Sequence, residues 1–168
     1  MGKATGIAID FMKKEDLDQV MAIEQASFSM PWSRNLFLSE FRSPSVSRLL
    51  VELAPDATVR TITGYLVFWL VAGEMHILNL ATVPGSRRQG IARSLVLAGL
   101  MHGYSKDARR AFLEVRVSNE SARKLYSSLG FTGTSIRRDY YDDPVEDAVL
   151  MTLEEGAFKS LATPPREV

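Results

Sequence analysis

The sequence predicts a mixed β-sheet with helices on its faces, folded as one α/β or α+β domain. The length of 168 residues suits one domain, and a hydrophobic fraction of 46% suffices for an ordinary core. Apolar segments with strand or helix periodicity follow one another without an internal repeat or an interdomain linker. We therefore expect one domain over residues 1–155 and a frayed tail over residues 156–168.

The composition excludes several classes of protein. Lys plus Arg and Asp plus Glu each number 20, and this zero net charge argues against a nucleic-acid partner. The absence of cysteine removes disulfides and thiol nucleophiles and agrees with the reducing cytosol, and two histidines are too few for a zinc site, so we expect no metal. The longest apolar stretch, Tyr65 to Ala72, is too short to span a membrane, and no signal peptide is visible. We expect a cytoplasmic protein with no membrane partner.

The first part of the chain is predicted to form a strand and two helices. Ile7 to Phe11 has the pattern of a short strand, and Lys14 to Phe28 carries the apolar stripe of a helix, with acidic residues in its first turn. The segment Met30-Pro31-Trp32-Ser33 interrupts this helix, and Ser33 is a suitable N-cap for a second one. We expect the second helix to end at Phe41 and to bury Leu36, Phe37 and Phe41.

Three strands joined by short turns are expected next. The turns are marked by Pro55-Asp56 and by Gly73-Glu74. The middle strand is rich in β-branched and aromatic residues, which favour strands. The strands of this meander are Arg48 to Leu53, Thr61 to Val71 and Met75 to Val83.

The second half of the chain alternates between helices and strands. A long helix is apolar nearly all round, so it should be packed on several sides. A later helix should end at Gly130, in the left-handed conformation that glycine favours. The expected elements are a helix over Ile91 to Ser105, a strand over Ala111 to Val117, a helix over Asn119 to Leu129, and strands over Thr132 to Arg138 and Ala148 to Leu153 around a loop from Asp139 to Asp147.

A polar turn before the long helix is the most informative segment. The backbone N–H groups at a helix start lack partners and attract anions such as phosphate. Gly90 and Ala92 keep large side chains away from this helix start, and Arg87, Arg88 and Arg93 add positive charge. The pattern is neither a Walker A loop nor a dinucleotide-binding glycine motif. The alternative is a polar loop whose arginines are merely solvated.

These residues carry a resemblance to a known family. Arg87-x-x-Gly90-x-Ala92 resembles the Arg/Gln-x-x-Gly-x-Gly/Ala signature of the GCN5-related N-acetyltransferases (GNAT). The order of elements resembles the family over almost the whole chain. Further segments resemble its RimI-type branch, bacterial enzymes that acetylate the N-terminal alanine of a small-subunit ribosomal protein: Pro31-Trp32-Ser33, residues 113–119, residues 125–131, and Arg137-Arg138-Asp139-Tyr140-Tyr141 followed by Glu146-Asp147-Ala148.

The resemblance implies a fold and a cosubstrate. The fold would be a single layer of mostly antiparallel strands with helices on both faces, and the cosubstrate would be acetyl-CoA. The strand of Leu80, Ala81 and Thr82 would pair with the acetyl and pantetheine groups, and Asn119 matches a CoA-contacting position, although it is also a suitable N-cap. The pyrophosphate would bind at Arg87, Arg88, Gln89, Gly90, Ile91, Ala92 and Arg93.

Acetyl transfer to an amine needs a base and an acid, and the sequence offers a candidate for each. Glu114 lies in a predicted central strand, where both faces should be apolar, so it is the candidate base; the alternative is a solvent-facing glutamate screened by Arg116. Tyr126 lies on the inward stripe of its helix and is the candidate acid; the alternative is a core tyrosine whose hydroxyl bonds to the backbone. The resemblance implies that Glu114 accepts the proton of the amine and that Tyr126 protonates the CoA sulfur.

The acceptor amine is expected to enter between two aromatic corners. These are Pro31-Trp32 and Tyr140-Tyr141, and aromatic rims suit a peptide, such as the N-terminus of a ribosomal protein; packing alone is the alternative. Two other functions remain open. The acceptor could be a lysine side chain, a polyamine or another small amine, since one fold hosts many acceptors. The protein could also be an acyl-CoA-binding module without turnover.

Overall fold

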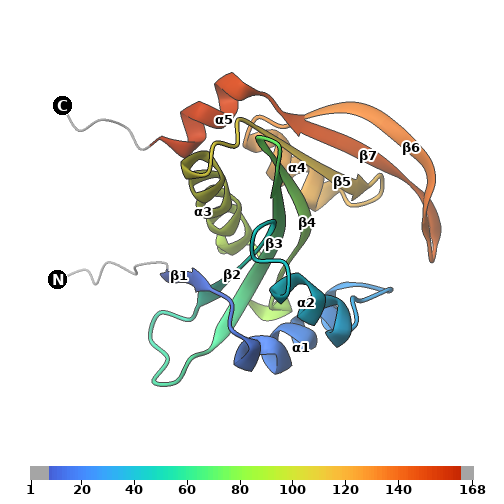
Figure 1. Ribbon diagram of the computed structural model, residues 1–168. Helices are drawn as coiled ribbons and strands as arrows, with labels where there is room; N and C mark the ends of the chain where they lie inside the picture. Colours follow the sequence, from blue (N-terminus) through green and yellow to red (C-terminus); the bar gives the residue numbers. More distant parts are fainter. Residues whose placement is uncertain (1–7, 164–168) are drawn as a thin grey trace. The chain divides into compact units, whose positions relative to one another are not determined.

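The computed structural model describes residues 8–163 (Figure 1). The predicted order of strands and helices is confirmed, with one further helix at the end. The elements are β1 (Ala8–Phe11), η1 (Lys14–Asp16), α1 (Leu17–Ser27), α2 (Arg34–Phe41), β2 (Ser47–Leu53), β3 (Ile62–Val71), β4 (Glu74–Thr82), η2 (Pro84–Ser86), α3 (Ile91–Ser105), β5 (Arg110–Arg116), α4 (Glu120–Ser128), β6 (Thr132–Asp142), β7 (Val145–Leu153) and α5 (Glu155–Ala162).

The described chain divides into two compact units. The first holds the chain up to Val67 together with Asn79–Ala98, and the second holds Phe68–Leu78 together with the chain from Gly99 onward. The hydrogen-bonded strand order is β1-β2-β3-β4 in the first unit and β3-β4-β5-β7-β6 in the second, so β3 and β4 contribute to both. The sheet is mixed, as predicted, because β4 and β5 are parallel whereas β1 and β2, β5 and β7, and β6 and β7 are antiparallel.

In the first unit, the start of α2 agrees with the sequence prediction but its buried face differs. The Oγ of Ser33 accepts the N–H of Leu36 at 3.2 Å and caps the helix. Phe37 is fully buried, and its ring packs against that of Tyr65 with the centroids 5.7 Å apart. The prediction that Leu36 is also buried was wrong, since it is 39% exposed. The buried residues of α2 are Phe37 and Glu40, which lie one helical turn apart, and Phe41, also predicted to be buried, is only half-buried.

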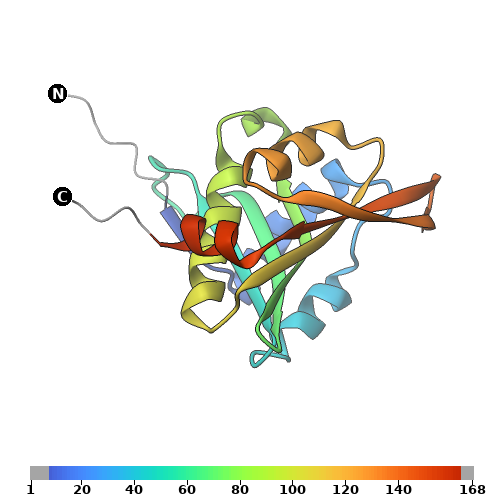
Figure 2. The same cartoon turned by 90° about the horizontal axis from the view of Figure 1, so that it is seen from above.

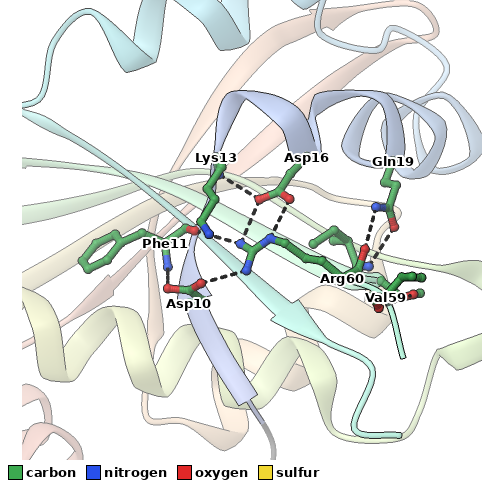
Figure 3. Close-up of polar contacts among 9 residues, drawn as sticks. Asp10, Phe11, Lys13, Asp16, Gln19, Val59 and Arg60 are labelled. Carbon is green, nitrogen blue, oxygen red and sulfur yellow. Dashed lines mark hydrogen bonds and ion pairs between the residues drawn. The ribbon is translucent and has the colours of Figure 1, made fainter. Parts of the chain in front are cut away.

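An ion-pair cluster ties β1, η1 and the segment before β3 together (Figure 3). The Nε of Arg60 lies 2.7 Å from Oδ1 of Asp16, and Nη1 of Arg60 lies 2.8 Å from Oδ2 of Asp10. Asp16 is only 2% exposed. Burial opposes its ionisation, but the hydrogen bonds from Arg60 and from the Lys13 backbone outweigh burial and hold the pKa of Asp16 below its usual value.

In the second unit, β5 and α4 form as predicted. Along β5 the buried residues Ala111, Leu113 and Val115 alternate with half-buried ones, as one expects of a strand with unequal faces. The Oδ1 of Asn119 accepts the N–H of Ala122 at 3.1 Å and caps α4. Gly130, with φ at +91°, follows the helix in the left-handed conformation.

The predicted loop over residues 139–147 was wrong. The strands β6 and β7 continue through it and form a long hairpin, seen from two sides in Figures 1 and 2. The register shifts between Arg137 and Tyr141, where Asp139 has φ at +49°, and pairing resumes with Tyr141 opposite Glu146. Such a bulge accommodates extra residues within a ladder, so a polar sequence can remain a strand.

The predicted frayed tail was wrong for the residues of α5. Phe158 is fully buried and Ala162 is 6% exposed, and they lie on one face because they are four residues apart. The ring of Phe158 lies 6.4 Å from that of Tyr104 in α3. The remainder of the expected tail, residues 164–168, lies outside the described residues, as does Ile7 of the first predicted strand. No helix within residues 8–163 is both long enough and apolar enough to cross a membrane.

Candidate active site

The turn between β4 and α3 has an open helix start. Arg88 and Gly90 both have positive φ, at +63° and +85°, and α3 begins at Ile91. The first carbonyl in this helix is that of Gly90, which accepts the N–H of Ser94 at 2.9 Å. A Cβ added to Gly90 would meet no atom within 4 Å. The helix start therefore borders open space at Gly90, as an anion site there requires.

The predicted anion-binding side chains gather around this turn. Arg87, Arg88, Gln89 and Arg93 are exposed, whereas Ile91 is buried and Ala92 is half-buried. The Nη2 of Arg87 donates to Oγ of Ser27, the last residue of α1, at 3.3 Å. The guanidinium groups are thus accessible to a ligand, and Arg87 is held near the end of α1.

The strand segment before the turn is packed closely against β3. Ala81 is 8% exposed, and Leu80 and Thr82 are half-buried. A Cβ added to Gly64 of β3 would lie 2.8 Å from Cγ2 of Ile91 and 3.1 Å from the carbonyl oxygen of Ala81. The missing side chain of Gly64 therefore lets the start of α3 settle on the sheet. No sequence pattern indicated this role for Gly64.

The Pro31-Trp32 corner is anchored by a buried carboxylate that was not predicted from the sequence. Glu24 in α1 is 1% exposed, and its Oε1 accepts the backbone N–H of Trp32 at 2.7 Å. Its Oε2 accepts from Nδ2 of Asn79 at 3.0 Å and from the hydroxyl of Tyr65. Burial and the neighbouring Glu24 carboxylate raise the pKa of Tyr65, so the phenol remains a donor. The available signal was an acid on the apolar stripe of a helix.

In the second unit, Glu114 is half-buried and pairs with an arginine. Its side chain is 26% exposed, and Oε1 lies 3.1 Å from Nη1 of Arg137 in β6. The alternative that Arg116 screens Glu114 was wrong, because Arg116 instead binds Oε2 of Glu146 at 3.3 Å and the carbonyl oxygen of Asp143 at 3.0 Å. Glu114 is therefore partly accessible and lies beside a charge partner.

Tyr126 is buried, and its hydroxyl is available. The residue is 5% exposed, and its ring meets that of Phe131 edge to face, with the centroids 5.5 Å apart. Within residues 8–163 the hydroxyl forms no hydrogen bond, so the expected alternative of a backbone-bonded core tyrosine was wrong. Burial, and to a smaller extent the phenol of Tyr141, raises the pKa of Tyr126 above its usual value. A tyrosine hydroxyl that has no partner among residues 8–163 suits a group that donates to a bound substrate.

Tyr141 lies within electrostatic range of both Glu114 and Tyr126. Burial raises its pKa to about 12; Tyr140 and Glu114 act in the same direction, and Arg116 opposes them. The rings of Tyr140 and Tyr141 are perpendicular, with the centroids 5.1 Å apart. Both lie on β6 near the hairpin turn rather than in a loop. The second unit thus gathers the predicted base, the predicted acid and one predicted aromatic corner.

Asn119 lies at the start of α4. Asn119 is exposed, and because its Oδ1 caps α4, its amide nitrogen is left for another contact. Among the described residues there is no group of three or more His, Asp or Glu side chains arranged to hold a metal ion.

The sequence pattern that defines the Acetyltransferase (GNAT) family matches residues 17–131. This chain belongs to the GNAT family. Named GNAT relatives share most of its length. A Bacillus subtilis protein provisionally named as a ribosomal protein bS18-alanine N-acetyltransferase is 36% identical over 148 residues, which cover 88% of this chain and 95% of the relative. The ribosomal protein bS18-alanine N-acetyltransferase of Escherichia coli K12 is 32% identical over 147 residues, 86% of this chain and 95% of the relative.

A solved GNAT structure agrees with the fold. The crystal structure of the ribosomal-protein-S18-alanine N-acetyltransferase from Escherichia coli matches with a TM-score of 0.76 and 28% identity, covering 97% of this chain and 99% of that one. The predicted family and the predicted GNAT fold are confirmed, and this GNAT protein is an N-acetyltransferase.

Proposed function

We propose that this GNAT enzyme transfers the acetyl group of acetyl-CoA to the N-terminal α-amine of a protein. The acceptor is the N-terminal alanine of a small-subunit ribosomal protein, the counterpart of bS18 in relatives at 30% identity and above, and the reaction takes place in the cytoplasm. The single observation that carries the chemistry is the buried residue Tyr126, whose hydroxyl has no partner in the described chain and whose pKa is raised by burial.

The residues of the β4–α3 turn fit the donor substrate. The open space above Gly90 and the exposed Arg87, Arg88 and Arg93 suit the pyrophosphate of CoA. Gln89, Ile91 and Ala92 contribute backbone amides, and the exposed amide of Asn119 suits a further polar contact to CoA. The edge of β4 at Leu80, Ala81 and Thr82 supplies backbone groups that orient the thioester and polarise its carbonyl.

Proton transfers accompany each bond change in the reaction. Glu114 takes a proton from the α-ammonium group, and the amine nitrogen then bonds to the acetyl carbon of the thioester. The carbon–sulfur bond breaks, and Tyr126 donates a proton to the departing thiolate. The nitrogen loses its second proton as the amide forms, and a proton returned through solvent restores the Tyr126 phenol. The partial exposure of Glu114 supports its role as the group that the entering amine meets, and the raised pKa of Tyr126 supports its role as the acid.

The aromatic corners hold the acceptor peptide. Pro31 is exposed and Trp32 half-buried in the first unit, and Tyr140 is 46% exposed beside Tyr141 in the second. Rigid aromatic side chains provide contact area at a low entropic cost, which favours a peptide over a small amine.

The test is acetylation of peptides followed by mass spectrometry. The wild type is incubated with acetyl-CoA and a panel comprising an alanine-starting peptide, the same peptide with a blocked N-terminus and an internal lysine, and a free polyamine. We expect acetylation of the unblocked alanine peptide, and a fall in kcat/KM of about 100-fold or more in Glu114→Gln and in Tyr126→Phe. Exclusive acetylation of lysine or polyamine would refute the acceptor, and undiminished turnover in both variants would refute the residue roles.

A further inference from the structure

The buried carboxylate of Glu24 serves three structural elements at once. It is 1% exposed and lies in the last turn of α1. One oxygen, Oε1, receives the N–H of Trp32 from the segment between α1 and α2, at 2.7 Å. The other oxygen, Oε2, receives Tyr65 of β3 and Asn79 of β4. One oxygen therefore binds the loop, and the other binds the sheet.

A buried carboxylate of this kind contributes little net stability to a fold. Removing a carboxylate from water carries a large penalty, and apolar residues of similar volume often replace buried ionic groups without loss of stability. Hydrogen bonds to a charged acceptor are, however, short and directional, so they fix geometry better than apolar contacts do. The arrangement therefore indicates that Glu24 holds the loop in a fixed position and does not serve stability alone.

The elements that Glu24 joins are those that the proposed function uses. Trp32 belongs to the aromatic corner proposed to hold the acceptor peptide, and its ring packs on Phe37 with the centroids 5.3 Å apart. Asn79 directly precedes Leu80, the first residue of the strand segment proposed to orient the thioester. Ser27, one turn after Glu24, receives Arg87 from the proposed pyrophosphate turn at 3.3 Å. The end of α1 is thus bonded to three parts of the proposed site. These are the acceptor corner at Pro31-Trp32, the donor strand β4 that orients the thioester, and the donor turn between β4 and α3 that binds the pyrophosphate.

We infer that Glu24 is a positioning residue that sets the acceptor corner relative to the acetyl-CoA strand by holding the Trp32 backbone and Asn79 on opposite oxygens of one carboxylate. It touches neither substrate. This inference rests on the proposed function, because it takes Trp32 as part of the peptide site and β4 as the donor strand. The inference has a specific kinetic consequence. Loss of the Trp32 anchor raises the KM for the acceptor peptide, whereas the donor turn with its arginines stays intact.

The matched variants are Glu24→Met and Tyr65→Phe. The first removes both acceptor oxygens at similar volume; the second removes one donor to Oε2 and leaves the bond to Trp32 in place. We expect Glu24→Met to raise the KM for an alanine-starting peptide by about tenfold or more, as the loss of a hydrogen bond to a charged group implies, with the KM for acetyl-CoA within about twofold. We expect Tyr65→Phe to lower the melting temperature but to keep the peptide KM within about twofold of the wild type.

The double variant Glu24→Met with Tyr65→Phe separates positioning from stability. The double variant removes the phenol hydroxyl that would otherwise lie unpaired against the methionine. Its melting temperature should therefore be higher than that of Glu24→Met. Positioning requires its peptide KM to stay raised. If the peptide KM returned to the wild-type value together with the melting temperature, Glu24 would be merely structural and the inference would be overturned, as it would by a wild-type peptide KM in Glu24→Met.

A second pair of variants applies if Glu24→Met does not fold. In Glu24→Gln the amide oxygen can still accept from Trp32, while its nitrogen donates to Tyr65 and, once the Asn79 amide flips, to Oδ1 of Asn79. We therefore expect a peptide KM near that of the wild type. Glu24→Asp keeps the charge but is one methylene shorter and cannot span both the loop and the sheet, so we expect its peptide KM to rise. Equal peptide KM values for these two variants would overturn the inference. A wild type that acetylates no N-terminal peptide would instead overturn the proposed function itself.

Discussion

The guanidinium of Arg116 lies over the ring of Tyr141, with Cζ 4.1 Å from the ring centroid. The same side chain bonds to Glu146 and to the carbonyl oxygens of Asp143 and Pro144, and Glu146 in turn receives the N–H of Ser118 at 2.5 Å. One arginine on β5 therefore holds the turn of the β6–β7 hairpin and the aromatic side chain that lies in electrostatic range of Glu114 and Tyr126.

The first prediction concerns this contact. Arg116→Ala should raise the peptide KM by about fivefold or more, because Tyr141 loses a cation–π contact and the hairpin turn loses two hydrogen bonds. Arg110→Ala is the matched control, since Arg110 is also on β5 and lies over a ring, that of Phe112, at 5.1 Å. Steady-state kinetics with an alanine-starting peptide measures both, and equal effects of the two substitutions would contradict the role given to Arg116.

The second prediction concerns the pH dependence of kcat. The pKa of Tyr126 is raised by burial, so the phenol stays protonated throughout the neutral and mildly alkaline range. The protonated phenol is the active form, and a raised pKa means that it loses its proton only at higher pH. We therefore expect kcat to show no alkaline decline due to Tyr126 below about pH 10. The measurement is kcat against pH for the wild type and Tyr126→Phe. A decline below that pH in the wild type that vanishes in the variant would count against this assignment.

The third prediction compares two glycines with similar backbones. Gly90→Ala and Gly130→Ala both place a side chain at positive φ, +85° and +91°, and each should cost about 1–2 kcal/mol of stability. Only Gly90 borders the proposed pyrophosphate site, so Gly90→Ala alone should raise the KM for acetyl-CoA, by about tenfold. Urea unfolding and donor kinetics test the pair. An unchanged KM for acetyl-CoA in Gly90→Ala would argue against that turn as the donor site.

The fourth prediction concerns the ion-pair cluster in Figure 3. Arg60→Met leaves the buried Asp16 without its cation and should lower the free energy of unfolding at pH 7 by about 2–4 kcal/mol. Arg34→Met is the control: its partner Asp18 has a side chain that is 87% exposed, and such pairs contribute little. Chemical denaturation of both variants gives the comparison, and similar losses would contradict a special role for Asp16.

The fifth prediction gives the pH dependence of the same cluster. The folded-state pKa values of Asp10 and Asp16 are lowered from the usual value of 3.8. A lowered folded-state pKa stabilises the protein above the unfolded-state value, and this contribution is lost as the pH falls through the folded-state value. The stability difference between the wild type and Arg60→Met should therefore be constant above about pH 5 and shrink below about pH 4. A difference that persists undiminished into the acid range would show that packing, not charge, carries the effect.

Local sequence signals predicted the elements whose boundaries depend on neighbouring residues. The caps at Ser33 and Asn119, the left-handed Gly130 and the helix Ile91–Ser105 all depend on contacts within a few residues, and the structure reproduces them. The alternation along β5 placed Glu114 opposite the buried face for the same reason. The motif residues around Arg87 and Gly90, together with the further segments and the order of elements, predicted the family, which is confirmed.

Only the tertiary structure decided what depends on residues far apart in the chain. Glu24 is 41 residues from Tyr65 and 55 from Asn79, so no local pattern could reveal that its carboxylate joins a loop to two strands. Glu114 pairs with Arg137 rather than with Arg116, and the polar segment around Tyr140 remains a strand because β7 pairs with it. The short α5 is ordered because Phe158 finds a buried position beside Tyr104. The physical reason is common to these cases: residue type determines local backbone preference, whereas charge pairing and burial depend on which distant side chain the fold brings near.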